Sequence, residues 1–368
     1  MDRIGGVKKI DPIGGTAVVG AGGRLSQLSK ELHDGGVAFP NLPDVDKQSL
    51  AGAVSTATHG TGKTLPSMSS GLKEITLVTA GGDVLACSPD HDGDVFSAAQ
   101  VSLGSLGILA EAEIEVVPSF RLVSETWVET LDNLLPRVMD LFDKHYTFEF
   151  FYMPFTNHCL CLSTDITQAP STEIPENTDD EGLAALKALR NNFSKLTPIR
   201  KKLGHIAMSG AESEKYINDS WKVLTSERTV PFNEMEYHLP ASIGLETLEK
   251  VIAHIEHYHS HVYFPIEVRF VKSDNAWLSP FYERDTISIA VHADHQDSYD
   301  FMFTDLEPIF LAAGGRPHWG KLNSLTAPEL AAMYPRWEDF QRIRQSIDPT
   351  GAFANPYLEK VFGLKRRG

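Results

Sequence analysis

The sequence predicts an α+β fold with two domains and a C-terminal segment. A chain of 368 residues, 42% of them hydrophobic, can build two separate cores. Short strands and helices alternate over residues 1–118, and Pro118 marks the end of this pattern. Over 119–316, strands return after longer helices, which favours an antiparallel sheet covered by helices on one face. Residues 317–368 form the last segment.

The elements expected in residues 1–118 follow from glycine turns and apolar spacing. Leu25, Leu28 and Leu32 predict a helix over 25–33, which Gly35 and Gly36 end. A second helix is expected at 95–100, followed by a glycine-spaced turn at 103–108. Strands are expected at 16–21, 75–79, 84–87 and 114–117.

The glycines of segment 20–25 admit two interpretations. Their spacing is that of a dinucleotide-binding fingerprint, but Leu25 stands where that motif requires glycine or alanine. A tight turn between a strand and a helix explains the same glycines and is the interpretation we favour.

The elements expected after residue 118 are longer. Strands are predicted at 121–127, 147–152, 159–162, 235–238, 262–270 and 287–292, and helices at 131–144, 182–192, 243–257 and 298–313. The acidic, proline-bearing stretch 164–180 is expected to be a surface loop. Proline in the first turn favours another helix at 335–344.

Charge and composition restrict the partners and the compartment. The net charge is −16, since 33 Lys and Arg oppose 49 Asp and Glu, and such a surface disfavours nucleic acid. We expect no transmembrane segment and a cytoplasmic location, with peripheral membrane association left open. Cys87, Cys159 and Cys161 are too few for a disulfide framework, so reduced thiols are expected. No set of metal ligands is evident, so no metal site is predicted.

The stretch from Ser49 to Gly62 has the clearest composition for a binding site. It holds three glycines, several hydroxyls and the imidazole of His59 within 14 positions. Glycine lets the backbone approach a ligand, and hydroxyls with free N–H groups can hold a phosphate or a polar ring edge. A small-residue loop packed against a strand is the alternative, and composition alone does not decide between them.

Several charged residues form a second candidate cluster. Glu267 and Arg269 stand two apart in a strand-like run, so both should lie on one face and Val268 on the other. A purely structural ion pair is the alternative. Lys321 could be a surface charge, and His292 could be a base, a hydroxyl partner or a structural histidine.

Four segments together resemble one group of flavoproteins. They are Ala51-Gly-Ala-Val-Ser-Thr-Ala-Thr-His-Gly60, Glu267-Val-Arg269, Trp277-Leu-Ser-Pro280 and His318-Trp-Gly-Lys321. In these segments the chain resembles the aldonolactone oxidases and alditol oxidases of the vanillyl-alcohol oxidase superfamily. The resemblance implies an FAD-binding domain of the PCMH type, N-terminally incomplete, at 1–118. It also implies a substrate or cap domain at 119–316 and a segment at 317–368 that returns to the FAD domain.

The resemblance also implies roles for individual residues. Glu267, Arg269 and Lys321 would be catalytic and, with His292, would contact the substrate. Arg269 would stabilise negative charge on the reduced flavin, Glu267 would accept hydrogen bonds from sugar hydroxyls, and Lys321 would stabilise alkoxide character. The implied FAD contacts are Asp44, Ser49, Gly52, Thr56, Ala57, Thr58, His59, Ile108 and His318.

The implied activity is oxidation of a sugar-derived alcohol by hydride transfer to flavin N5, with oxygen or another electron acceptor. Ala290 stands where the alditol oxidases have a polar residue. This difference favours an aldono-1,4-lactone of the gulono, galactono or arabinono type. An alditol such as xylitol or sorbitol is the alternative.

One family feature is absent from the sequence. Members of these families normally carry a Gly-x-Gly-His-Ser loop around the FAD pyrophosphate, and its histidine often bonds covalently to the flavin. No such motif occurs here, so covalent attachment through that histidine is not expected. Three interpretations follow: an incomplete copy of an active oxidase, a protein that binds FAD in an altered way, or a non-catalytic remnant without stable FAD.

Overall fold

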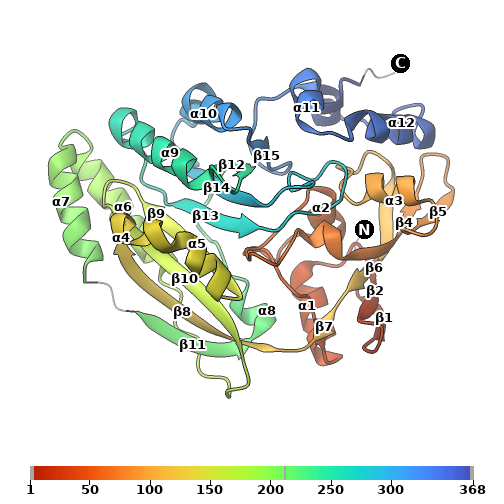
Figure 1. The fold of residues 1–368 in the computed structure, drawn as a ribbon, viewed down its shortest axis with the longest axis horizontal. Helices are drawn as coiled ribbons and strands as arrows, with labels where there is room; N and C mark the ends of the chain where they lie inside the picture. Colours follow the sequence, from red (N-terminus) through yellow and green to blue (C-terminus); the bar gives the residue numbers. More distant parts are fainter. Residues whose placement is uncertain (1–3, 211–212, 365–368) are drawn as a thin grey trace.

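The computed structural model describes residues 4–210 and 213–364, which form two lobes joined along one side (Figure 1). The second lobe is built on an eight-stranded sheet, called the large sheet below, with the order β11-β8-β10-β9-β13-β14-β12-β15. Every neighbouring pair in it is antiparallel, which confirms the predicted sheet type. Its strands are β8 (Arg121–Thr130), β9 (Thr147–Met153), β10 (His158–Thr167), β11 (Glu214–Asp219), β12 (Phe232–Pro240), β13 (Ile266–Val271), β14 (Thr286–Asp294) and β15 (Arg316–Pro317).

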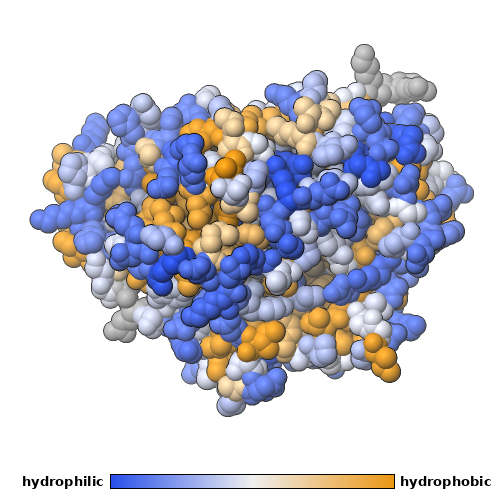
Figure 2. Space-filling view, in the orientation of Figure 1, coloured by the Kyte–Doolittle hydropathy of each residue, from blue (hydrophilic) through white to orange (hydrophobic). Residues whose placement is uncertain are grey.

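Alternation along the central strands gives the large sheet one apolar face. Phe148, Val268, Ile289 and Tyr237, one from each of β9, β13, β14 and β12, are fully buried in a common cluster. Helices cover this face: α4 (Leu131–Leu134), η2 (Leu135–Arg137), α5 (Val138–Lys144), α9 (Gly244–Tyr258) and α10 (Glu307–Ala312). Figure 2 shows apolar residues gathered where α5 and α9 cover the sheet, with further apolar patches at the left and lower edges of this view.

The first lobe contains a five-stranded sheet of order β1-β2-β6-β4-β5. Its strands are β1 (Val7–Asp11), β2 (Thr16–Gly20), β4 (Leu72–Val78), β5 (Val84–Cys87) and β6 (Ile108–Glu115), and β3 (Val37–Ala38) pairs separately with β7 (Val117–Pro118). The helices are α1 (Leu25–Asp34), α2 (Leu50–Ser55), η1 (Met68–Gly71) and α3 (Gly93–Ala99). β1 was not predicted, and the strand expected at 114–117 begins already at Ile108.

The glycines near residue 20 serve close packing. A Cβ added at Gly20 would lie 2.8 Å from the carbonyl of Ile4, and one at Gly23 would lie 2.9 Å from Cδ2 of Leu28. The segment is the turn between β2 and α1, as favoured from the sequence.

The middle of the chain differs most from expectation. β10 continues to Thr167 because it pairs with β8 as far as Arg121, so the surface loop is shorter than 164–180. The sequence patterns did not predict α7 (Thr197–Met208), β11 or α8 (Ser220–Val223), which follow α6 (Asp179–Phe193). A π-helix, η3 (Met302–Leu306), precedes α10 where one continuous helix was expected.

The last helices pack against the first lobe. They are α11 (Ala327–Met333), α12 (Trp337–Ile347) and α13 (Pro356–Phe362). Phe340 and Phe362 belong to the same apolar cluster as Leu28 and Ile75. The domain limits remain a prediction. The three cysteines are buried free thiols, and no helix in the described residues is long and apolar enough to cross a membrane.

Candidate active site

The face of the large sheet opposite to the helices carries polar side chains in register across β9, β13, β14 and β12. They share this face because they stand two positions apart on their strands, and side chains at that spacing point to the same side of a sheet. The register places Glu149 beside Arg269, Arg269 beside Ser288, and Ser288 beside His238; the next row holds Glu267, Ala290 and Glu236, and the last holds His292 and Glu234. This set is called the polar face below.

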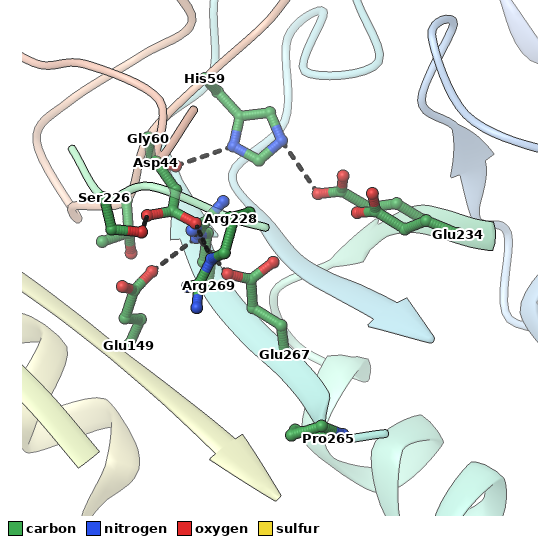
Figure 3. A network of polar contacts seen from close by, with 12 residues as sticks. Asp44, His59, Gly60, Glu149, Ser226, Arg228, Glu234, Pro265, Glu267 and Arg269 are labelled. Atoms are coloured by element: carbon green, nitrogen blue, oxygen red, sulfur yellow. Dashed lines mark hydrogen bonds and ion pairs between the residues drawn. The ribbon is translucent and has the colours of Figure 1, made fainter. Parts of the chain in front are cut away.

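Arg269 lies between two carboxylates on the polar face (Figure 3). Its Nε donates to Oε2 of Glu149 at 2.5 Å, and its Nη2 lies 2.5 Å from Oε1 of Glu267. Burial alone would lower the pKa of Arg269, but Glu149 and Glu267 outweigh it and raise that pKa further. Arg269 is therefore a permanent cation in a fixed position.

Glu267 has a different electrostatic balance. Burial raises its pKa to about 7, although the Arg269 guanidinium opposes this change. Its carboxyl group can therefore gain or lose a proton near neutral pH.

Asp44 connects the first lobe to this group. Its Oδ2 accepts from Nε of Arg228 at 2.8 Å, and its Oδ1 accepts from the hydroxyl of Ser226 at 2.5 Å (Figure 3). Burial would raise the pKa of Asp44, but Arg228 and Arg269 lower it. Asp44, expected from the resemblance at the flavin, thus lies close to the charged cluster on the polar face.

Lys321 and His292 meet at Glu234. The Lys321 ammonium pairs with the Glu234 carboxylate, and Nε2 of His292 lies 3.7 Å from its Oε1. Burial alone would raise the pKa of Glu234, but Lys321 and His292 together lower it to about 2. Burial would likewise lower the pKa of Lys321, yet Glu234 raises it. A carboxylate and an ammonium therefore coexist here at neutral pH.

Three imidazoles gather where the lobes touch. His59 Nε2 lies 3.0 Å from Oε1 of Glu236, and its Nδ1 lies 2.7 Å from the carbonyl oxygen of Gly60. The ring of His318 lies 5.7 Å from those of His59 and His238. Burial lowers the pKa of His318 to about 4 and that of His238 well below its usual value. His59 thus ties the segment 49–62 directly to β12.

The first half of the segment 49–62 is α2, which the sequence patterns did not predict. Ser49 caps it, since its Oγ accepts from the N–H of Gly52 at 3.3 Å. Gly52 is exposed, whereas Thr58 is buried and its hydroxyl donates to Gln48. Thr56, half-buried, and Ala57, in the left-handed region with φ of 55°, form the turn after the helix.

The turn before β6 lies beside α2. The N–H of Leu103 donates to the carbonyl of Ser55 at 3.0 Å, and Gly104 has open space where a side chain would stand. Ile108 follows and is 45% exposed. These small and apolar groups fit the flat ring system and the backbone contacts of a flavin nucleotide.

The structure therefore brings seven of the predicted residues into one connected region: Asp44, His59, Glu267, Arg269, His292, His318 and Lys321. Ser49, Gly52, Thr56, Ala57 and Thr58 lie along α2 and the turn after it, and Ile108 lies beyond the neighbouring turn.

Sequence reasoning missed Glu149, Arg228, Glu234, Glu236 and His238. Two signals were present. Glu149 interrupts an apolar strand run, and Glu234, Glu236 and His238 stand at alternating positions of another strand. A buried strand does not usually carry a titratable residue at each position of one face.

The fold and the site define an FAD-binding oxidoreductase. Residues 112–361, more than half of the chain, match the family model described as D-arabinono-1,4-lactone oxidase, and residues 1–88 match that of an FAD-binding domain. The chain belongs to the D-arabinono-1,4-lactone oxidase family, which confirms the resemblance seen in the sequence.

Individual relatives agree with this assignment. The chain is 34% identical over 365 residues to L-gulono-1,4-lactone dehydrogenase of Mycobacterium tuberculosis, covering 97% of this chain and 84% of that protein. It is 30% identical to L-gulonolactone oxidase of Bos taurus, with 98% and 84% covered, and 27% identical to alditol oxidase of a Streptomyces species, with the same coverage. All three of these relatives are named as enzymes, which gives no support to the interpretation as a non-catalytic remnant.

The fold also matches a solved structure, the cholesterol oxidase of B. sterolicum. The TM-score is 0.78 at 17% identity, with 98% of this chain and 83% of that chain covered. This likeness confirms the predicted fold class.

Proposed function

We propose that this protein oxidises an aldono-1,4-lactone, and that the polar face of the large sheet binds the sugar. The observation that carries the proposal is Arg269, a buried cation held at 2.5 Å by both Glu149 and Glu267. The segment 49–62 lies beside it, since the N–H of Gly62 donates to the carbonyl of Phe270 at 2.8 Å. A fixed positive charge at that place favours the development of negative charge during oxidation.

Each residue of the polar face has its own proposed role in the reaction. FAD, held by α2 and the turn after it, would supply the acceptor for the hydride that leaves the sugar carbon. Glu267, as a carboxylate, accepts hydrogen bonds from sugar hydroxyls and orients the reacting carbon. Lys321, which Glu234 keeps in place, stabilises alkoxide character as the hydroxyl proton leaves. His292, held through Nδ1 by the carbonyl of Pro265 at 2.9 Å, is placed to receive that proton at Nε2.

We propose that α2, the turn after it and Ile108 hold FAD without a covalent bond to His59. Both ring nitrogens of His59 already have partners, Glu236 and the carbonyl of Gly60. Acid precipitation of the FAD-loaded protein checks this proposal, since all flavin should remain in the supernatant. Flavin that stays with the protein would contradict it.

A substrate panel tests the proposed function. Purified protein loaded with FAD is given gulono-, galactono- and arabinono-1,4-lactones and, in parallel, xylitol and sorbitol. Because the named relatives include a dehydrogenase and oxidases, turnover is measured both with oxygen and with an artificial electron acceptor. We expect the lactones to give the highest kcat/KM. Turnover of the alditols alone would refute the lactone assignment and favour the alternative that the Streptomyces relative suggests.

A further inference from the structure

Three side chains with metal-binding atoms meet among the helices that cover the large sheet, on the face opposite to the candidate active site. His254 lies in α9, His259 directly follows that helix, and Asp305 lies in η3. One atom from each residue, an imidazole nitrogen or a carboxylate oxygen, lies within 4.8 Å of the other two. Oδ2 of Asp305 is 2.9 Å from Nε2 of His259 and 3.9 Å from Nε2 of His254.

The Nε2 atoms of both imidazoles face the Asp305 carboxylate without forming a regular hydrogen bond. Within the described residues, Nε2 of His254 and Nε2 of His259 are buried atoms without a hydrogen bond of normal geometry, although the second lies near Asp305. A buried polar atom without a partner is costly. The side chains of His254, His259 and Asp305 are 27%, 12% and 34% exposed, so the group lies near the surface of the helical layer.

The surrounding structure positions these ligands. The ring of Phe301 packs against His259 with centroids 4.8 Å apart, and Tyr258 packs against His254 at 4.7 Å. Asp305 occupies a π-helix, a rare local geometry that often occurs at functional sites.

The sequence contains a matching signal that was not used. The segment 254–261 reads His-Ile-Glu-His-Tyr-His-Ser-His and holds four of the 14 histidines of the chain. Short histidine-rich tracts are typical of metal binding. The third ligand, Asp305, lies far along the sequence, so the spacing alone did not predict a site.

We propose that His254, His259 and Asp305 bind a divalent transition-metal ion, for which Zn²⁺ is the best match. Two imidazole nitrogens and one carboxylate oxygen are common zinc ligands, and water completes the fourth position. Zinc–ligand bonds of about 2.0–2.2 Å place tetrahedral ligand atoms roughly 3.3 Å apart. The observed 2.9 Å and 3.9 Å lie on either side of this value. The ion would join the end of α9 to η3 and so fasten the helical layer.

Calorimetric titration with ZnCl₂ tests the proposal on the full chain, loaded with FAD and free of any histidine tag. His254→Ala and His259→Ala should each weaken binding at this site by about 100-fold or more, since even the loss of a group that only orients a ligand costs about 10- to 100-fold. The matched control is His257→Ala, because His257 is exposed on the same helix outside the group and should leave binding unchanged. Zn²⁺ should raise the Tm of the wild type and of this control only.

A second experiment, with Co²⁺, separates loss of the metal ligand from misfolding of a variant. Co²⁺ bound by the wild type should give the visible absorption of a tetrahedral site, and Asp305→Asn, which keeps the side-chain shape, should lose that absorption. The proposal fails if the wild type binds no Zn²⁺. It also fails if His254→Ala, His259→Ala and Asp305→Asn bind Zn²⁺ as tightly as the wild type does.

Discussion

The two faces of the large sheet come from the same strands and serve different purposes. On β13, Val268 and Phe270 point into the apolar layer under the helices, whereas Glu267 and Arg269 point to the other lobe. One face is held together by packing, and the other holds charges that burial alone would disfavour. The comparison shows that alternate residues of one strand lie on the packed face or on the polar face, so that neighbours in sequence have different surroundings.

The strongest test of the apolar face is Phe148→Ala. Phe148, on β9, is fully buried and packs against Phe142 of α5. Its truncation should therefore lower the free energy of unfolding by about 3–5 kcal/mol. Denaturant unfolding measures this loss. The kcat/KM of the folded, flavin-loaded fraction should stay near that of the wild type. A large loss of kcat/KM in that fraction would break the distinction between the faces.

On the polar face, Lys321→Met should reduce kcat/KM by about 100-fold, because the ammonium that we propose to stabilise the alkoxide is lost. Stability should change with pH as well. In the wild type the pKa of Glu234 is lowered to about 2, so its contribution to stability is present above its usual pKa and is lost as pH falls toward 2. This contribution should shrink in the variant, as unfolding measured across acidic pH will show. If turnover of the variant is unchanged, the assignment of Lys321 to the active site is wrong.

A smaller effect is expected for Glu267→Gln, at about tenfold in kcat/KM, because a hydrogen bond to a charged group contributes about 1.5 kcal/mol. Because burial raises the pKa of Glu267 to about 7, wild-type kcat/KM should fall as pH drops through neutrality and this carboxylate is protonated. The same raised pKa means that the fold loses stability as pH rises from the usual glutamate range through about 7. The variant should show neither change. If kcat/KM of Glu267→Gln still falls as pH drops through neutrality, another group is responsible for that fall.

The smallest effect concerns specificity. Ala290 lies in register with both Glu267 and Glu236, so Ala290→Ser adds a hydroxyl at the centre of the polar face. We expect a few-fold shift of the kcat/KM ratio from lactone toward alditol. Its neighbour Ile289 faces the helices, and Ile289→Val should leave the ratio unchanged while lowering stability by about 0.5–1.5 kcal/mol. A shift caused by Ile289→Val rather than Ala290→Ser would reverse the assignment of the faces.

The sequence could predict which residues share a face of the large sheet where the residues belong to one strand. Alternation over 262–270 placed Glu267 and Arg269 on one face of the sheet, and the structure shows both on that face, where they form an ion pair. It could not predict that Glu149 and Glu234 lie on the same face, since the order of strands depends on pairing between distant segments. Nor could composition show that α2 begins at Leu50, because glycine and β-branched residues are weak helix formers and tertiary packing decides the outcome.

The central claim is that Arg269 acts on the reaction itself. Mixing FAD-loaded protein with the preferred lactone in the absence of oxygen, and following the loss of visible flavin absorbance, measures the hydride-transfer step alone. We predict that Arg269→Lys, which keeps the charge but loses the planar contact with Glu149 and Glu267, reduces flavin about 100-fold more slowly at equal flavin content. Reduction at the wild-type rate would contradict the account.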